Sequence, residues 1–235
     1  IVLFGDYTIT YPTVFRICFP LIRDEPIKRD RQVKTFTVTL VRHGKVNGAS
    51  ALYGSTDVEV SPETNQAICN SLANADIHYK TVISSPLRRC LSLAELLAGE
   101  HLLVCEPALK EMYFGQLDGT PFEEITSVSE EWQRLEQFWH NPASSGLPDA
   151  ESLENFNRRV TACWTRIVSE LQHDVLIITH GGVIRAIVAD VLGLDWKNPK
   201  WYSNLTIRNG SITQIQVTMA DNEPYFSVKQ IGSTH

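Results

Sequence analysis

The chain has 235 residues, 43% of them apolar, so it can bury a substantial hydrophobic core. A single domain of about 200 residues with a short appendage is the simplest partition of that length. The 27 acidic residues outnumber the 21 basic residues and give a net charge of −6. This balance argues against general nucleic-acid binding, and an anionic substrate would have to be attracted by a local cluster of cations.

The cysteines and histidines show no metal-ligand spacing. The five cysteines are odd in number and widely spaced, without a CxxC pair: Cys18, Cys69, Cys90, Cys105 and Cys163. Scattered cysteines are typical of small buried thiols in a reducing compartment. The seven histidines include no HExxH pair. We therefore expect a cytoplasmic protein that uses no metal and no other cofactor.

Residues 1–34 differ in character from the rest of the chain. Residues 9–22 are largely apolar but are interrupted by Pro12, Arg16 and Pro20, which makes the stretch too short and too broken to span a bilayer. Basic residues follow this stretch, whereas in a signal peptide they would precede it. We expect residues 1–34 to be an accessory or non-native extension, residues 35–235 to form the functional domain, and no membrane to be involved.

Strand and helix patterns alternate from residue 35 onward. Short β-branched runs predict strands at residues 36–41, 81–84, 102–105 and 175–178. Longer segments predict helices at residues 62–75, 86–97, 153–171 and 183–192. Alternation on both sides of Asn209–Gly210 predicts a β-hairpin within residues 205–215. This order is typical of an α/β domain with three layers, in which a doubly wound, mostly parallel sheet carries helices on both faces.

Three of the predicted strands end in polar residues. The first runs into Arg42-His43-Gly44, the second into residues 84–89 and the last into residues 179–182. The carboxyl ends of parallel strands meet at one edge of the sheet, where α/β domains bind their ligands. Arginines, imidazoles, hydroxyls and a Gly-Gly helix entrance together favour a bound anion. The sequence therefore predicts a phosphate pocket at this edge.

Five motifs occur in a fixed order along the chain. They are Arg42-His43-Gly44, Ser84-Ser85-Pro86-Leu87 with Arg89, Leu109 and Glu111 with Gly115 and Gly119, Ala150-Glu151-Ser152, and Thr179-His180-Gly181-Gly182. In this order and spacing they resemble the histidine phosphatase superfamily, also called the phosphoglycerate mutase-like family. Each motif alone is weak, but together they are specific. The resemblance, over residues 36–217, implies a phosphoglycerate mutase-like fold.

The resemblance also implies a role for each of five residues. His43 would attack the phosphorus as the nucleophile and form a phosphohistidine, which water then hydrolyses. Glu111 would be the general acid that protonates the leaving group and then the base that activates water. Arg42, Arg89 and His180 would surround the phosphate oxygens and stabilise them without a metal.

Several neighbouring positions match the family pattern less closely. Arg88 adjoins Arg89, but successive helical residues point about 100° apart, so only one can face the pocket. The motif spacing selects Arg89. Lys45 stands where family members commonly carry an acidic residue or a serine. Further contacts to the phosphate or the substrate are expected from Asn47, Ser55 and Gly181.

The segment that follows Glu111 bears on the reaction and the substrate. Family mutases shelter the phosphohistidine with an insertion longer than residues 112–150, so the shorter segment favours hydrolysis over transfer. Residues 111–119 and 53–57 resemble alpha-ribazole phosphatases, which implies alpha-ribazole 5′-phosphate or adenosylcobalamin 5′-phosphate, in cobalamin biosynthesis, as the small-molecule substrate. A broad-specificity sugar-phosphate or fructose-2,6-bisphosphate phosphatase is the alternative. A non-catalytic phosphate-binding module is an alternative from another class, although all five residues with implied roles are present.

The same segment contains aromatic side chains whose faces would suit a flat benzimidazole. They are Phe122, Trp132, Phe138, Trp139 and His140. Trp132, Leu135 and Trp139 also recur at helical spacing, which is more typical of packing than of ligand contact. The sequence leaves both uses open, and it does not set the oligomeric state.

Overall fold

The computed structural model describes residues 33–234. The predicted extension over residues 1–34 therefore lies outside the described residues, apart from its last two positions. Within residues 33–234, none of the helices is long and apolar enough to span a membrane.

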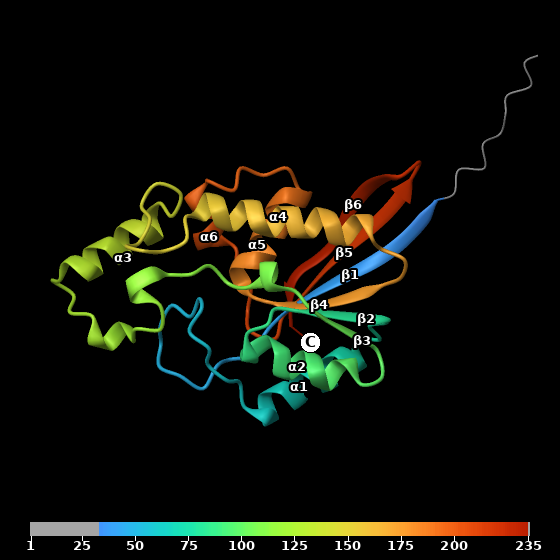
Figure 1. Cartoon of the computed structure of the whole chain (residues 1–235), viewed down its shortest axis with the longest axis horizontal. Coiled ribbons are helices and arrows are strands. Elements are labelled where there is room, and N and C mark those ends of the chain that lie inside the picture. Colours follow the sequence, from blue (N-terminus) through green and yellow to red (C-terminus); the bar gives the residue numbers. More distant parts are fainter. Residues whose placement is uncertain (1–32, 235) are drawn as a thin grey trace, which may run out of the picture. The chain divides into compact units, whose positions relative to one another are not determined.

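A six-stranded sheet lies at the centre of the described domain, with the strand order β3-β2-β4-β1-β5-β6 (Figure 1). The strands are β1 (Lys34–Arg42), β2 (Thr81–Ser84), β3 (Leu102–Cys105), β4 (Val175–Thr179), β5 (Ile212–Ala220) and β6 (Glu223–Ser233). β3, β2, β4 and β1 pair in parallel, whereas β5 and β6 are antiparallel to their neighbours. The prediction of an α/β domain with a mostly parallel sheet is confirmed.

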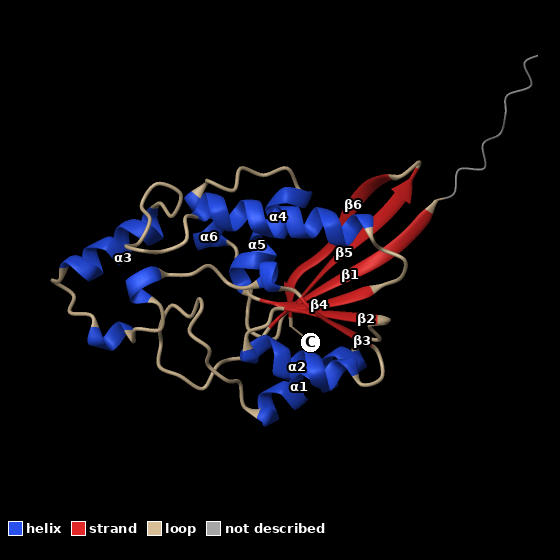
Figure 2. Ribbon diagram, viewed as in Figure 1, coloured by secondary structure: helices blue, strands red, loops and turns tan. Residues whose placement is uncertain are grey.

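Helices cover both faces of this sheet, as Figure 2 shows. The helices are α1 (Pro62–Asn74), α2 (Arg88–Ala98), α3 (Glu130–His140), α4 (Leu153–Ser169), α5 (Gly181–Val191) and α6 (Pro199–Asn204). Val175 and Ile177 of β4 join the hydrophobic core under α4 and α5, whereas Leu176 and Ile178 join the core under α1 and α2. Alternate residues of a strand face opposite sides of a sheet, so this uninterrupted apolar run fits a strand covered on both faces.

The segment between β3 and α4 carries the elements that project beyond the sheet. It contains α3 and the short 3₁₀ turns η1 (Pro107–Leu109), η2 (Gly115–Leu117) and η3 (Phe122–Glu124). α3 packs against α6 rather than against the sheet. In Figure 1 both helices lie on the side toward which β1 runs, so they flank the carboxyl ends of the parallel strands.

Local sequence signals explain most of the helix ends. Ser61 caps α1 and Ser152 caps α4, because each hydroxyl accepts a hydrogen bond, at 3.2 Å, from a backbone N–H three residues later. Gly99 follows α2 with a φ of 52°, a conformation that glycine adopts without strain. α2 begins at Arg88, two residues later than predicted, because Leu87 is extended.

The predicted hairpin around Asn209–Gly210 is wrong. β5 begins only at Ile212, and it pairs with β1 on one side and β6 on the other. The turn of the real hairpin is Asp221–Asn222, where φ is 54° and 66°. A two-residue hairpin turn with positive φ at both central residues favours asparagine and aspartate, so the signal was present at a position that the sequence analysis did not use.

Residues 205–208 do not form a strand, and side chains bind two of their carbonyl groups. The Leu205 carbonyl accepts hydrogen bonds from Nε and Nη2 of Arg185, at 3.1 and 2.8 Å. The Ile207 carbonyl accepts a bond of 2.6 Å from Nη1 of Arg42. Two arginines therefore replace the neighbouring strand that a hairpin would have supplied.

The left-handed backbone at Asn222 gives a test of the observed turn. An alanine at such a position is strained by about 1 kcal/mol relative to glycine. We expect Asn222→Ala to lower the free energy of unfolding by about that amount compared with Asn222→Gly, measured by urea unfolding. Equal stability of the two variants would contradict this turn geometry.

Candidate active site

The structure brings the ends of β1, β2 and β4 together. The backbone N–H of His43 donates to the Thr179 carbonyl at 3.0 Å, and that of Ser85 donates to the Ile178 carbonyl at 3.0 Å. The parallel pairing thus continues past the strands and into the polar segments. The rings of His43 and His180 lie with their centroids 5.1 Å apart. Residues far apart in the sequence therefore meet at one edge of the sheet, where the polar strand ends predicted a phosphate pocket.

His43 is a buried imidazole whose protonation is fixed by its surroundings. Its Nδ1 lies 2.7 Å from the carbonyl oxygen of Gly44. Since a carbonyl can only accept, Nδ1 must carry the hydrogen, which leaves the lone pair on Nε2. Burial, together with the nearby charges of Arg42 and Arg89, lowers the pKa of His43 to about 3. At neutral pH His43 is therefore an uncharged imidazole with a free lone pair on Nε2.

The backbone after His43 is held in place from two sides. A Cβ atom at Gly44 would lie 2.7 Å from side-chain carbons of both Val60 and Thr64, so the glycine permits this close packing. On the other side, Nδ2 of Asn209 donates to the carbonyls of His43 and Gly44 at 3.1 and 3.2 Å. Sequence analysis missed this role, because it assigned Asn209–Gly210 to a hairpin turn.

Two arginines flank the entrance of α5. A Cβ atom at Gly181 would lie 3.4 Å from both Nε of Arg42 and Nη1 of Arg185. Nε of Arg42 is buried and has no hydrogen-bond partner among the described residues. Burial lowers the pKa of Arg42 and of Arg185, while the Glu111 carboxylate raises it in both cases. Since arginine starts from a pKa of 12.5, both guanidinium groups remain charged.

Arg89 and His180 lie deeper than the other site residues and are fully buried. Nε of Arg89 donates to Nδ1 of His180 at 3.3 Å, so the His180 hydrogen is on Nε2, which lies 2.8 Å from the Ser85 hydroxyl. Burial, followed by His43 and the arginines, holds the pKa of His180 well below its usual range. His180 is therefore also neutral. Arg88, by contrast, is exposed and pairs with Glu59 at 3.3 Å, so Arg89 is the arginine that faces the interior.

The Glu111 carboxylate accepts two backbone hydrogen bonds. Oε1 accepts from the N–H of Met112 at 3.1 Å, and Oε2 accepts from the N–H of Gly182 at 3.0 Å. A Cβ atom at Gly182 would lie 2.3 Å from Oε1, so no larger residue fits there without moving Glu111. Gly182 lies in the first turn of α5, where free N–H groups and the helix dipole favour an acceptor.

Arg159 holds the backbone of the segment that carries Glu111. Its guanidinium donates to the carbonyls of Ala108, Lys110 and Glu111 at 2.8, 2.9 and 3.0 Å. The same group forms two parallel bonds with the Glu151 carboxylate, at 2.7 and 2.8 Å. The motif Ala150-Glu151-Ser152 therefore contributes to the site indirectly. The sequence carried no local sign of Arg159, which lies in the middle of α4.

Two adjoining cavities open onto part of this site, and Arg89 and His180 line neither of them. One, of about 430 Å³, contains the nucleophile candidate; it is lined by Arg42, His43, Lys45, Val46, Gly48, Ala49, Ser50, Ala51, Leu52, Tyr53, Glu111, Phe114 and Asn209. The other, of about 340 Å³, is mainly apolar; it is lined by Leu52, Glu111, Met112, Phe114, Phe138, Trp139, Pro142, Leu153, Phe156, Gly182, Arg185, Tyr202 and Ser203. Leu52, Glu111 and Phe114 line both, so the two form one cleft with a polar end and an apolar end.

The other predicted contacts differ in their placement. Asn47 and Ser55 are exposed and line neither of the two cavities. Gly181 is buried between the arginines. Lys45, which the sequence analysis noted as a departure from the family pattern, lines the polar cavity.

Aromatic residues of the 112–150 segment pack against one another, and some of them also line the apolar cavity. Trp139 lines the apolar cavity and has 41% of its surface exposed. Its ring contacts the rings of Phe122 and Trp132 edge-on, with centroid distances of 5.6 and 6.0 Å. Phe138 lines the same cavity but is largely buried. Leu135 is fully buried in the core. The stripe at helical spacing therefore packs α3 in place and also supplies a wall of the cleft.

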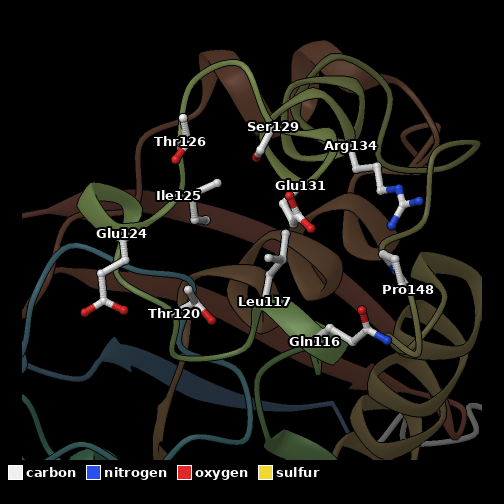
Figure 3. Close-up of a pocket in the computed structure, with 10 residues that line it drawn as sticks. All are labelled: Gln116, Leu117, Thr120, Glu124, Ile125, Thr126, Ser129, Glu131, Arg134 and Pro148. Carbon is white, nitrogen blue, oxygen red and sulfur yellow. The ribbon is translucent and has the colours of Figure 1, made fainter.

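A separate cavity of about 390 Å³ lies between the 115–126 segment and α3. Figure 3 shows its lining: Gln116, Leu117, Thr120, Glu124, Ile125, Thr126, Ser129, Glu131, Arg134 and Pro148. It shares no residue with the cleft, and none of the predicted site residues lines it. Among residues 33–234, no group of three or more His, Cys, Asp or Glu side chains could hold a metal ion.

Residues 38–226 match the histidine phosphatase superfamily (branch 1). A Hydrogenobacter thermophilus protein named "Putative phosphoserine phosphatase 2" is 30% identical over 193 residues, covering 76% of this chain and 88% of that protein. A Yersinia pestis protein named "Probable phosphoglycerate mutase GpmB" is 25% identical over 186 residues, covering 76% and 83%. The alpha-ribazole phosphatase of Shigella flexneri has the same fold, with a TM-score of 0.69, 20% identity, and 84% and 96% coverage. The chain therefore belongs to the histidine phosphatase superfamily, branch 1, and is a hydrolase that acts on phosphomonoesters.

Proposed function

We propose that the chain hydrolyses its phosphomonoester through a covalent phosphohistidine on His43. The observation that carries this proposal is the neutral imidazole of His43, whose Nε2 keeps its lone pair and which shares a cavity with Arg42 and Glu111. The guanidinium groups of Arg42, Arg89 and Arg185 outnumber the Glu111 carboxyl group beside them, whether that group is ionised or, as the first step requires, protonated. A phosphomonoester dianion would balance this excess of positive charge.

In the first step, the Nε2 lone pair forms a bond to phosphorus while the bond between phosphorus and the ester oxygen breaks. The oxygen that leaves takes a proton from the Glu111 carboxyl group. The buried N–H of Arg42 that lacks a partner is available to a phosphate oxygen during this transfer. The products of the step are the free alcohol, a phosphohistidine and an ionised Glu111.

In the second step, a water molecule replaces the alcohol. The Glu111 carboxylate takes a proton from the water, whose oxygen attacks phosphorus as the bond to Nε2 breaks. The lone pair returns to Nε2, Glu111 is protonated again, and inorganic phosphate leaves. The hydrogen bond from Nδ1 to the Gly44 carbonyl holds the ring orientation through both steps.

We further propose alpha-ribazole 5′-phosphate as the substrate. The apolar cavity begins at Glu111, where the leaving group must lie, and its walls include Phe114, Trp139 and Phe156. A volume of about 340 Å³ bounded by aromatic faces suits a flat, largely apolar base such as the benzimidazole of alpha-ribazole. The adenosylcobalamin 5′-phosphate ester would present the same benzimidazole, joined to the phosphate through the ribose.

Phosphoserine is the second candidate, and it is favoured by the relative that is 30% identical. Its leaving group is small and carries both a carboxylate and an ammonium. Within the apolar cavity the only cation among the described residues is Arg185, and two of its nitrogens already donate to the Leu205 carbonyl. This cavity therefore matches an aromatic leaving group better than serine.

The experiment that tests the function is phosphate release from a panel of esters in excess EDTA. Alpha-ribazole 5′-phosphate, phosphoserine, 3-phosphoglycerate and fructose 2,6-bisphosphate are compared by kcat/KM. A clear preference for the ribazole ester supports the proposed substrate, whereas a preference for phosphoserine replaces it. Turnover of none of the esters contradicts the catalytic proposal and favours the phosphate-binding module.

Replacing the nucleophile tests the covalent step. His43→Asn keeps a side-chain N–H that can donate to the Gly44 carbonyl but removes Nε2 as a nucleophile. We expect kcat to fall by at least ~10³-fold because a transition-state interaction is lost. Acid-labile ³²P label on the protein, seen after alkaline quenching of the parent, should be absent from the variant. Activity close to that of the parent would rule out a phosphohistidine at this position.

The low pKa of His43 predicts a pH dependence of stability. Because the pKa falls from 6.5 to about 3 on folding, the unfolded chain binds one more proton between these values. The contribution of neutral His43 to the free energy of unfolding is fully present above about pH 6.5 and is lost as the pH falls toward 3. From about pH 6.5 to about pH 5 the expected loss is about 2 kcal/mol. Urea unfolding of the parent and of His43→Asn at both pH values should show a smaller loss in the variant, whereas equal losses would contradict the burial effect.

Shortening Trp139 tests the apolar end of the cleft. Trp139→Ala should raise KM for alpha-ribazole 5′-phosphate by about fivefold, since an aromatic contact contributes about 1 kcal/mol. The KM for 3-phosphoglycerate should change little. Tyr113→Ala is the matched control, because Tyr113 is 40% exposed, against 41% for Trp139, and lines neither cavity of the cleft. Equal effects of the two variants would contradict the proposed contact.

A further inference from the structure

The side chain of Arg89 is oriented by three backbone carbonyl groups. Nη1 donates to the Thr56 carbonyl at 2.9 Å, and Nη2 donates to the carbonyls of Tyr53 and Gly54 at 2.9 and 2.7 Å. With Nε on His180, these bonds leave one hydrogen of Nη1 without a partner among the described residues. A fully buried guanidinium can point that hydrogen at a phosphate only if the carbonyls hold it there.

These carbonyls belong to a segment that has no regular secondary structure, residues 53–57. No strand or helix hydrogen bonds fix its shape, so its conformation must depend on other contacts. Asp118 provides several of them. Its Oδ1 accepts from the N–H of Thr56 at 2.7 Å, its Oδ2 accepts from the N–H of Ser55 at 2.9 Å, and its carbonyl accepts from the Thr56 hydroxyl at 3.2 Å.

Steric contact joins the same two segments. A Cβ atom at Gly54 would lie 2.2 Å from Oδ2 of Asp118 and 2.2 Å from the carbonyl oxygen of Met112. The glycine therefore allows residues 53–57 to lie directly against the carboxylate. An ionised carboxylate that accepts several backbone N–H groups forms stronger hydrogen bonds than a neutral acceptor would.

We propose that Asp118 is a positioning residue for phosphate binding, acting through residues 53–56 on Arg89. The carboxylate fixes the segment, the segment's carbonyls fix the guanidinium, and the remaining N–H of the guanidinium is thereby kept available to a phosphate oxygen. Asp118 itself lines neither cavity of the cleft. This inference rests on the proposed role of Arg89 in binding phosphate.

Asp118 has one other route to the site. Its Oδ2 also accepts from the N–H of Phe114 at 3.1 Å, and Phe114 lines both cavities. Through that contact the carboxylate could influence how the leaving group binds. The two routes make different predictions, because inorganic phosphate has no leaving group to occupy the apolar cavity.

The test begins with the affinity of the protein for inorganic phosphate, measured by isothermal titration calorimetry. Asp118→Asn has nearly the same shape, but its amide nitrogen cannot accept, so at least one of the backbone N–H groups loses its partner. We expect phosphate affinity to fall by about tenfold or more. The kcat/KM values for two different esters should fall by the same factor, since both esters share the phosphate. Unchanged phosphate affinity with an ester-dependent loss would overturn the proposal in favour of the route through Phe114.

A double-mutant cycle then asks whether the effect passes through Arg89. In the Arg89→Lys background, Asp118→Asn should weaken phosphate binding much less than in the parent, because the guanidinium that it positions is absent. Arg42→Lys is the matched control: Arg42 is held by the Ile207 carbonyl, in a different segment. Asp118→Asn should therefore have its full effect in that background. An equal effect in all three backgrounds would overturn the positioning role.

Two further results keep the outcomes distinct. If Arg89→Lys alone leaves phosphate affinity unchanged, the proposed role of Arg89 is wrong, whatever Asp118 does.

If Asp118→Asn does not fold, as judged by circular dichroism, Thr56→Val replaces it in the cycle, since this variant removes a single hydrogen bond between the two segments. Thr56→Val should then lower phosphate affinity by about threefold in the parent, a smaller loss than for Asp118→Asn, and should not lower it in the Arg89→Lys background. Additive effects would again overturn the proposal.

Discussion

A neutral imidazole surrounded by guanidinium cations is the arrangement on which the rest of this site depends. Burial lowers the pKa of both kinds of side chain, but the starting values differ. His43 begins near neutrality and loses its charge, whereas Arg42 begins far above it and keeps its charge. One apolar environment thus leaves an uncharged imidazole and a charged guanidinium within the same cavity, as the proposed mechanism requires. The hydrogen bond to the Gly44 carbonyl adds the orientation that burial alone cannot supply.

Charged side chains stabilise the loops of this site by binding backbone groups. Arg159 donates hydrogen bonds to three backbone carbonyls in the segment that ends at Glu111. Asp118 accepts hydrogen bonds from backbone N–H groups of the segment whose carbonyls bind Arg89. In each case a charged side chain that lines neither cavity of the cleft restrains the backbone beside a residue of the proposed site. Loops can then carry the functional residues without the mobility that loops usually have, because a charged hydrogen bond restrains each one.

Local sequence patterns were sufficient to predict elements whose structure depends mainly on their own residues. The apolar run at 175–178 predicted a strand covered on both faces, and the strand ends predicted where the polar residues would meet. Local sequence patterns were insufficient where the hydrogen-bond partners of a segment come from distant parts of the chain. Residues 205–208 alternate like a strand, yet arginines from β1 and α5 occupy two of their carbonyls. Asn209 and Arg159 likewise act only through residues far from them in sequence, which no local pattern records.

β1 occupies a special position, because it pairs in parallel with β4 on one side and antiparallel with β5 on the other. Both partners lie near the end of the chain, whereas β1 stands at the start of the described domain. During synthesis on the ribosome, β1 therefore emerges long before either partner exists. Its β-branched, apolar sequence must remain unpaired until β4 and β5 follow, and pairing over such long separations is slow. While it is unpaired, the strand that later positions His43 is therefore exposed to aggregation.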